Sequence, residues 1–447
     1  MIIFLKNIYF ELVESRYFKN LFLLTTGVGV SQLIPLFLLP ILTRFFSPTD
    51  FGVLAIFLAI VQLLAITTTL RLEMAIVLPK KDTDAALLCL TAMLFLSVFS
   101  ILFFIILFLL WSFIVNTEIT EYYDTVGYKI FGLNIENLIK YKKDTYIPFF
   151  YLIPIGSFCL GLYNILYSWN NRMELYKNMS FSQITHSIFS TPLSILFYFT
   201  PLKKIGLILG QVIGRFISCL LLLKNIYITL KIISRKELFS KSIFLVKEYK
   251  KFIIFETPHA MLNFISQKYI IGVFTSLFGL FTVGIFDLAD KIIAKPLGLI
   301  SNSFKTVFYK RLTTAKDKLT IFKKTLILMT VISFVLTIPF YIIPDSFFVI
   351  LLGPEWVDTG RYIKLLCPLL FSRFIFNVVT PSISYTMQNH YLLFWQIFYF
   401  LGLVFLFIFS KGLSVENVIF IYAIFGALMY FLLGFISFLV LKKNIKF

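Results

Sequence analysis

The sequence predicts an all-α polytopic membrane protein of about twelve transmembrane helices arranged in two six-helix lobes. Of its 447 residues, 59% are apolar and 18% are aromatic, and its mean hydropathy is +0.91. The apolar residues form uninterrupted runs of about 20, without the alternation of polar and apolar positions that barrel strands require. Because a backbone in hydrocarbon has to satisfy its own hydrogen bonds, these runs predict helices.

The individual spans are apolar windows separated by charged or turn-forming segments. Residues 1–19 mix charged, aliphatic and aromatic side chains, which predicts an interfacial helix at the membrane surface. The predicted N-terminal lobe covers residues 20–223, a basic cytoplasmic linker covers residues 224–252, and the C-terminal lobe covers residues 253–447. The predicted spans are 20–42, 52–70, 86–114, 147–168, 181–200, 205–223, 257–277, 280–303, 324–343, 363–383, 391–410 and 416–440.

The formal net charge of +19 is interpreted as a signal of membrane topology, because cytoplasmic loops are enriched in Lys and Arg. When the N-terminus is placed inside, these residues concentrate in the loops on the side of the termini. The pattern therefore predicts that both termini are cytoplasmic, and it gives no reason to expect a nucleic-acid partner. Six helices return the chain to its starting side, so the two halves are predicted to be parallel repeats.

The sequence shows no sign of metal, cofactor or catalytic chemistry. Cys89, Cys159, Cys219 and Cys367 lie inside apolar segments without CxxC spacing, and no histidine has a ligand partner at a metal-binding distance in sequence. Walker-type and HExxH motifs are absent. The predicted outside loop at residues 115–146 carries carboxylates, but their spacing marks no catalytic pair. We therefore predict that the protein is not an enzyme; a membrane polysaccharide polymerase or glycosyltransferase is the enzyme alternative.

Ionisable side chains inside the predicted spans are the clearest functional signal, because charges in hydrocarbon usually face a cavity or a partner. Asp287, Asp290 and Lys291 follow helical spacing and lie along one stripe of a predicted helix. Lys295 continues this stripe, and Lys268 lies at comparable depth on the preceding span. The candidate substrate-binding cations are Lys268, Arg215, Lys291 and Arg373, and the candidate coupling carboxylates are Asp287 and Asp290.

These cations outnumber the carboxylates, which predicts a net positive cavity suited to an anionic ligand. In the alternative interpretation the charges form buried ion pairs that fix helix register, with Asp287 paired to Lys291 and with Lys295 extending to the interface. A drug or metabolite exporter that moves cationic compounds would favour an acidic cavity. The sign of the cavity charge therefore distinguishes these two classes of transporter.

Several short runs of residues are spread over most of the chain. The two most specific are the run from Arg71 to Pro79 and the stretch from Asp290 to Arg311. The others are Leu42-Thr43-Arg44, Ser47-Pro48, Asp50-Phe51-Gly52, Trp169 with Arg172, Glu256-Thr257-Pro258 and Gly353-Pro354-Glu355-Trp356 with Gly360. Together these runs resemble the Wzx-type flippases of bacteria, which belong to the multidrug/oligosaccharidyl-lipid/polysaccharide (MOP) superfamily.

The resemblance implies a MATE-like fold with a central cationic cavity in the bacterial cytoplasmic (inner) membrane. It implies a flippase that moves undecaprenyl-pyrophosphate-linked oligosaccharide repeat units of O-antigen, capsule or a related surface polysaccharide. Transport would proceed by alternating access coupled to an ion gradient, without a cofactor. The expected partners are this lipid-linked substrate, the lipid bilayer, and a polysaccharide polymerase and chain-length regulator. Lys291 stands where the family more often has arginine, so the family's phosphate contact does not transfer directly to it.

Further roles follow from the same resemblance. Arg71 and Glu73, with Glu256, are predicted gating residues that help to close the inward-facing state; alternatively, Arg71 only anchors the loop on the cytoplasmic side. Lys268 is predicted to contact the diphosphate of the lipid carrier. In the empty cavity, Asp287 or Asp290 is expected to pair with Lys268.

Overall fold

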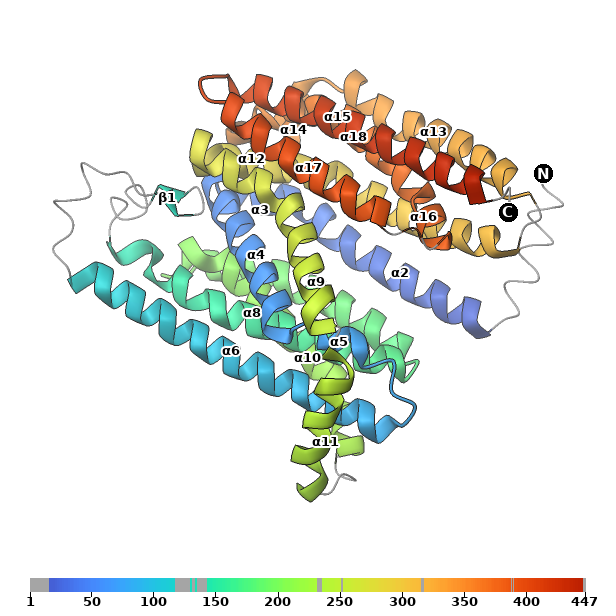
Figure 1. The fold of residues 1–447 in the computed structure, drawn as a ribbon. Coiled ribbons are helices and arrows are strands. Elements are labelled where there is room, and N and C mark those ends of the chain that lie inside the picture. The colour runs from blue at the N-terminus through green and yellow to red at the C-terminus, as the bar shows by residue number, and fades with distance from the viewer. Residues whose placement is uncertain are drawn as a thin grey trace. The chain divides into compact units, whose positions relative to one another are not determined.

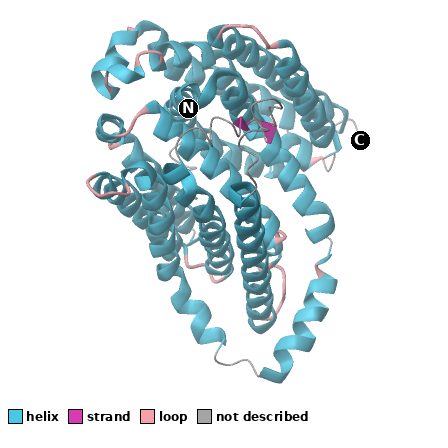
Figure 2. Cartoon of the chain, turned by 90° about the vertical axis from the view of Figure 1, so that its left-hand side faces the viewer, coloured by secondary structure: helices cyan, strands magenta, loops and turns pink. Residues whose placement is uncertain are grey.

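The computed structural model is helical almost throughout (Figures 1 and 2). Within its described residues, the only strands are the short antiparallel pair β1 (Lys129–Ile130) and β2 (Leu133–Asn134). The predicted interfacial segment 1–19 and the loop at 115–146 lie mostly outside these residues. The structure describes residues 16–116, 129–130, 133–134, 143–230, 235–250, 252–314, 317–386, 388 and 390–444.

The helices follow one another with short connections. Those up to Glu248 are α2 (Arg16–Phe37), α3 (Leu39–Phe45), α4 (Pro48–Thr69), α5 (Leu72–Ala75), α6 (Asp82–Asn116), α8 (Lys143–Arg172), α9 (Tyr176–Tyr198), η1 (Lys203–Ile205), α10 (Gly206–Leu230) and α11 (Arg235–Glu248). The later ones are η2 (Phe252–Glu256), α12 (Thr257–Thr314), α13 (Lys318–Ile342), α14 (Asp345–Leu352), η3 (Pro354–Trp356), α15 (Thr359–Val379), α16 (Pro381–Tyr385), α17 (His390–Phe409) and α18 (Val415–Asn444).

Ten described helical segments are long and apolar enough to cross a membrane. One of them, Ile253–Tyr309, has 57 residues, which corresponds to about 85 Å and far exceeds the hydrocarbon core. It is interrupted at Gly279, where φ is 81° and ψ is 177°, in the gap between two predicted spans. The span predicted at 181–200 lies on α9, whose buried face carries several serines that lower its hydropathy. The all-helical, multi-pass class is confirmed, whereas the count of twelve stays a prediction.

The chain divides into two compact units. The first unit comprises Met1–Leu38 and Ile56–Ile265, and the second comprises Leu39–Ala55 and Ser266–Phe447. The segment Leu39–Ala55, from the N-terminal part of the chain, therefore belongs to the second unit. The predicted division into lobes 20–223 and 253–447 with a linker at 224–252 stays a prediction.

Small side chains allow close helix packing within the first unit. A Cβ atom added at Gly210 of α10 would lie 2.1 Å from Ser194 Oγ of α9, and one added at Gly214 would lie 2.9 Å from Ser190 N. Near the other end of the unit, the indole of Trp169 is completely buried in a core that includes Leu72 of α5. These contacts join α5, α8, α9 and α10 through the residues that the sequence places on their inner faces.

The segment Leu39–Ala55 is held in the second unit by specific contacts around Trp356. The Trp356 indole Nε1 donates a hydrogen bond of 3.2 Å to the Thr43 carbonyl, and its ring packs edge-on against Phe51 at a centroid distance of 5.1 Å. Arg44 Nη2 donates to the Ile350 carbonyl at 2.5 Å. A Cβ atom at Gly284 would lie 1.8 Å from the Pro48 carbonyl oxygen. Several of the short runs that carry the resemblance therefore have a packing role here.

Candidate functional site

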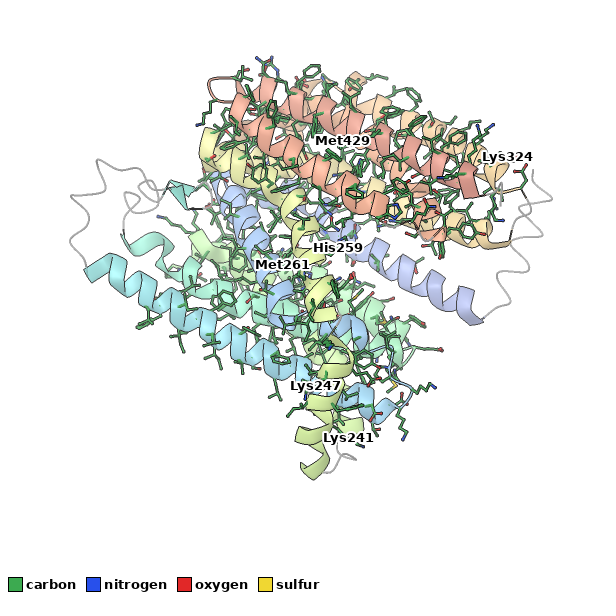
Figure 3. All side chains as sticks on the ribbon, viewed as in Figure 1. Lys241, Lys247, His259, Met261, Lys324 and Met429 are labelled. Atoms are coloured by element: carbon green, nitrogen blue, oxygen red, sulfur yellow. The ribbon has the colours of Figure 1, made fainter. Side chains whose placement is uncertain are left out.

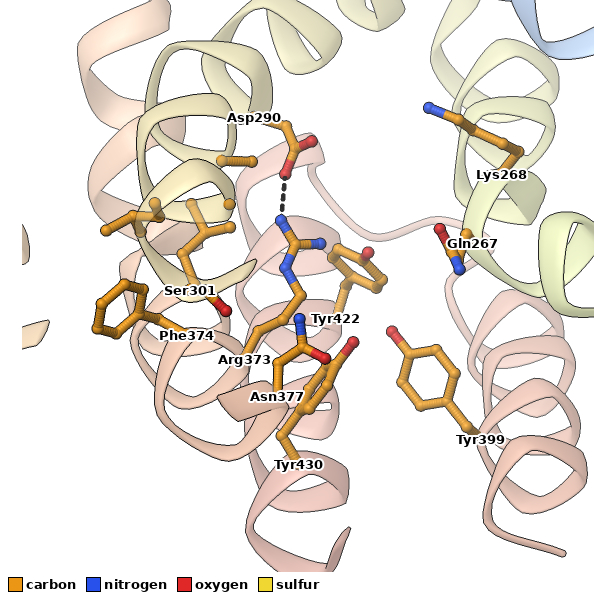
Figure 4. A pocket seen from close by; sticks show the side chains of 14 residues that line it. Gln267, Lys268, Asp290, Ser301, Arg373, Phe374, Asn377, Tyr399, Tyr422 and Tyr430 are labelled. Carbon is orange, nitrogen blue, oxygen red and sulfur yellow. Dashed lines mark ion pairs between the residues drawn. The ribbon is translucent and has the colours of Figure 1, made fainter. Parts of the chain in front are cut away.

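The second unit contains a polar pocket of about 390 Å³ between α12, α15, α17 and α18 (Figure 4). It is the strongest candidate for a functional site because charged and hydroxyl-bearing side chains converge in it from helices of strongly apolar sequence. Its polar lining residues are Gln267, Lys268, Asp290, Ser301, Arg373, Asn377, Tyr399, Tyr422 and Tyr430.

An ion pair between α12 and α15 lies on one wall of the pocket. Asp290 Oδ1 lies 3.5 Å from Arg373 Nη2, and the two side chains are 35% and 33% exposed. The contact is long for a charge-assisted hydrogen bond, and only one guanidinium nitrogen is involved. Because both groups are accessible from the pocket, an anionic ligand can compete with Asp290 for Arg373.

Three tyrosines surround Arg373 and form an aromatic wall of the pocket. Tyr399, Tyr422 and Tyr430 all lie within electrostatic range of its guanidinium. Tyr399 is held in place by stacking on Trp395, with a centroid distance of 5.3 Å and an interplanar angle of 7°. The wall therefore presents phenol groups at fixed positions, which suits a ligand rich in hydroxyl or phosphate oxygens.

Lys268 extends into the pocket from the first half of α12, on the side facing Asp290 and Arg373 (Figure 4). Among the residues that the structure describes, its ammonium has no ion pair and no hydrogen bond. The structure gives both carboxylates expected to pair with it other partners: Asp290 contacts Arg373, and Asp287 contacts Lys291. Lys268 is therefore an uncompensated cation at the pocket.

Asp287 and Lys291 form an ion pair one helical turn apart on α12, and neither lines the pocket. The Asp287 side chain is buried. The alternative interpretation that these two residues pair with each other is confirmed, so their local role is to balance charge within α12. Lys295 is half-buried and has Lys291, Asp287 and Lys268 as its charged neighbours.

Arg215 belongs to the first unit, whereas the pocket belongs to the second. Its guanidinium lies 4.5 Å from the ring centroid of Tyr163, in a cation–π contact. The Tyr163 hydroxyl in turn lies 3.3 Å from Ser182 Oγ. Within the described part of the chain, Arg215 has no carboxylate partner. Its predicted role as a substrate-binding cation stays a prediction.

The predicted gating residues lie around α5 in the first unit. Arg71 Nη1 lies 3.2 Å from Glu73 Oε1, and Glu73 is only 3% exposed. Leu70 and Arg71 have positive φ values of 50° and 55°, a conformation that costs free energy in residues other than glycine. The buried ion pair thus holds a strained turn. Glu256 ends η2, which packs against α5 and is a single π-helical turn, a feature frequent at functional sites.

Burial raises the pKa of the Glu73 carboxyl above its ordinary value of 4.5, and the Arg71 charge offsets part of this rise. The folded protein therefore binds a proton at Glu73 more tightly than the unfolded chain, so stability falls as pH rises from 4.5 through the raised pKa. We expect the melting temperature of the purified protein to fall over this range by a few degrees more in wild type than in Glu73→Gln.

The slope with pH, and not the absolute melting temperature, carries this test, because Glu73→Gln also weakens the contact with Arg71. Glu174→Gln is the matched control, since Glu174 is exposed in the same unit. A Glu73→Gln variant with the wild-type slope would contradict the burial of a titrating carboxyl. If that variant also transports normally at wild-type abundance, Arg71 acts only as an anchor.

Sequence reasoning missed several pocket residues. Tyr399, Tyr422 and Tyr430 lie well inside their spans, whereas membrane tyrosines usually lie at the interface, and this position was an available signal. Lys305 was assigned to a loop, but α12 continues to Thr314, and Lys305 Nζ donates to Asn377 Oδ1 at 3.4 Å.

The described chain is thus a multi-pass helical membrane protein with a polar site among its helices, an architecture typical of secondary transporters. Residues 17–309 match the family of polysaccharide biosynthesis proteins, and the chain belongs to this family. The resemblance to Wzx-type flippases is thereby confirmed. A comparison with curated protein sequences found no match.

Solved structures show the same fold. An inward-facing multidrug resistance MATE family transporter of the MOP superfamily has a TM-score of 0.62 at 15% identity, covering 94% of each chain. A MATE transporter in complex with MaL6 has a TM-score of 0.59 at 14% identity, covering 95% of this chain and 97% of the other. A MOP superfamily transporter from Pyrococcus furiosus has a TM-score of 0.57 at 11% identity, covering 96% of each. The predicted MATE-like fold is confirmed, and family and fold together support a transporter.

Proposed function

We propose that this protein is a flippase that moves undecaprenyl-pyrophosphate-linked oligosaccharide repeat units across the bacterial cytoplasmic membrane by alternating access. The observation that carries the proposal is the pocket of the second unit, where Lys268 has no acidic partner among the described residues and Arg373 is only loosely paired with Asp290. The pocket therefore has a net positive charge. Membership of the polysaccharide biosynthesis family supports a lipid-linked sugar as the source of the matching anion.

The diphosphate group of the carrier fits the chemistry of the pocket. An uncompensated ammonium in hydrocarbon costs at least about 2–3 kcal/mol, and a phosphate bound beside it would recover this cost. Lys268 supplies a point charge, and Arg373 supplies a planar fork suited to two phosphate oxygens. The phenol groups of the tyrosine wall and the Asn377 amide offer hydrogen bonds to phosphate and sugar oxygens. The polyprenyl tail would stay in the bilayer.

Coupling to an ion gradient follows from competition at Arg373. When a diphosphate displaces Asp290 from the guanidinium, the carboxylate loses its partner and becomes able to take up a proton. A ligand shifts a conformational equilibrium only through contacts that differ between the states, and this exchange provides such a difference. No covalent step is required. A polysaccharide polymerase and a chain-length regulator are the proposed downstream partners, and both termini are proposed to be cytoplasmic.

A drug or metabolite exporter is the second candidate, because structural neighbours include a multidrug resistance MATE family transporter. The pocket charge disfavours this candidate, since cationic compounds would be repelled by Lys268 and Arg373. The Pyrococcus furiosus transporter is described as having a binding pocket of reverse polarity that suggests a different function. Pocket polarity is likewise the property that separates the two candidates here.

Deletion of the protein in its source bacterium tests the proposed function. We expect surface polysaccharide to disappear while lipid-linked repeat units accumulate on the cytoplasmic leaflet, and we expect a plasmid copy to restore export. The accumulated units are measured by extraction of labelled lipid and by their protection from an external glycosidase. Unchanged surface polysaccharide combined with a new sensitivity to cationic dyes would instead identify a drug exporter.

A further inference from the structure

A polar strip extends from the pocket along two facing helices. Ser301 and Lys305 lie one turn apart on α12, and Arg373 and Asn377 lie one turn apart on α15, so each pair shares a helix face. The strip is closed by a hydrogen bond of 3.4 Å from Lys305 Nζ to Asn377 Oδ1. Because Asn377 lines the pocket and Lys305 does not, the lysine lies directly beyond the amide at the edge of the pocket.

Two polar groups in this strip lack the partners expected of buried groups. Lys305 is half-buried, and within the described chain it has no carboxylate partner, only the long contact to the neutral Asn377 amide. Ser301 is 2% exposed, lines the pocket, and its hydroxyl has no hydrogen-bond partner among the described residues. An unsatisfied hydroxyl and an unpaired ammonium on one helix face indicate a place for an anionic oxygen ligand.

The strip lies at a different depth from the pair of Asp290 and Arg373. From Asp290 to Lys305 the backbone of α12 rises by about 22 Å, and the long Lys and Arg side chains shorten this separation without removing it. Lys268 lines the pocket together with Asp290, so it belongs to the opposite end from Lys305. A compact diphosphate bound by Lys268 and Arg373 therefore does not also occupy the position of Lys305.

We propose that Lys305, oriented by Asn377, is a second anion-binding station, which the diphosphate of the lipid carrier contacts before it reaches Lys268 and Arg373. The inference rests on the proposed function and on its topology, in which α12 runs toward the cytoplasmic side. A lysine that served only as an interfacial anchor would extend away from the pocket, whereas Lys305 donates to a residue that lines it. The station binds substrate on the side from which it enters, and the pocket then receives it.

Binding of farnesyl diphosphate to the purified full-length protein tests this station. The protein is placed in phosphatidylcholine nanodiscs, which contain no anionic lipid, and the association rate and Kd are measured. We expect Lys305→Met to reduce the association rate and affinity by about tenfold, in the range of one charge-assisted hydrogen bond, and Lys305→Arg to retain most of both. The matched control is Lys324→Met, because Lys324 is an exposed lysine of the same unit on α13 (Figure 3).

Substitution of Asn377 tests the charge without removing the lysine. Asn377→Asp places a carboxylate beside Lys305 and is expected to reduce binding about as much as Lys305→Met, again about tenfold. Asn377→Leu leaves the ammonium without a compensating charge and is expected to have the smaller effect. This pair keeps the proposal testable if Lys305→Met does not fold.

The outcomes separate the station from the proposed function. Equal binding by Lys305→Met, Asn377→Asp and Lys324→Met, with binding lost in Lys268→Met, would overturn the station alone. No binding of farnesyl diphosphate by wild type would overturn both. Phosphatidylglycerol added to the nanodiscs distinguishes a lipid headgroup from the carrier: competition that disappears in Lys305→Met would assign the station to headgroup phosphate and overturn its role in transport.

Discussion

Lys268→Met is expected to abolish export of lipid-linked repeat units while leaving the protein folded and inserted. Lys268 has no ion-pair or hydrogen-bond partner among the described residues, so its removal leaves no carboxylate unpaired and creates no buried orphan charge. What the substitution removes is the uncompensated positive charge at the pocket. Transport should fall by at least about 100-fold, which corresponds to about 2.7 kcal/mol of lost ligand stabilisation.

The measurement is restoration of surface polysaccharide in the deletion strain, with membrane abundance determined by immunoblot. Lys268→Arg keeps the charge and should retain part of the activity. Lys291→Met is the informative contrast, because Lys291 pairs with the buried Asp287 and does not line the pocket. Its loss leaves a buried carboxylate unpaired, so we expect reduced abundance as the primary effect. Normal export by stably expressed Lys268→Met would exclude Lys268 from substrate binding.

The fold class was predictable because it depends on local composition. Apolar runs of membrane-spanning length specify helices regardless of what they pack against. The gap predicted between spans 257–277 and 280–303 also contains the observed interruption, Gly279, because a glycine between apolar segments is a local signal. The membership of Leu39–Ala55 in the second unit was not predictable. It depends on contacts such as that between Thr43 and Trp356, which are far apart in sequence.

The candidate site shows the same division between local and long-range information. The pair of Asp287 and Lys291 follows from helical spacing alone, and the structure contains it. The pair of Asp290 and Arg373 joins two helices, so the sequence placed both residues at mid-depth without indicating that they meet. Lys305 was missed because a charged residue near the end of an apolar run looks like the start of a loop, whereas the helix continues beyond it.

Asp290→Asn is expected to separate substrate binding from coupling. In wild type, Asp290 and an incoming diphosphate compete for Arg373, whose side chain is exposed to the pocket. Removing the carboxylate charge ends this competition, so farnesyl diphosphate should bind about tenfold more tightly. The variant has no carboxylate at this position to take up a proton when substrate arrives. Export should therefore fall by at least about 100-fold and should lose its response to the pH gradient.

Asp287→Asn provides the matched control, since Asp287 lies on the same helix but pairs with Lys291 and does not line the pocket. It should leave farnesyl diphosphate affinity unchanged and act through protein abundance. The measurements are Kd in nanodiscs and uptake of a fluorescent polyprenyl-diphosphate sugar into proteoliposomes with an imposed pH gradient. Tighter binding combined with slower transport would be the signature of a competing carboxylate, because loss of an ordinary structural ion pair weakens both. If Asp290→Asn transports at the wild-type rate with the wild-type pH response, coupling does not pass through Asp290.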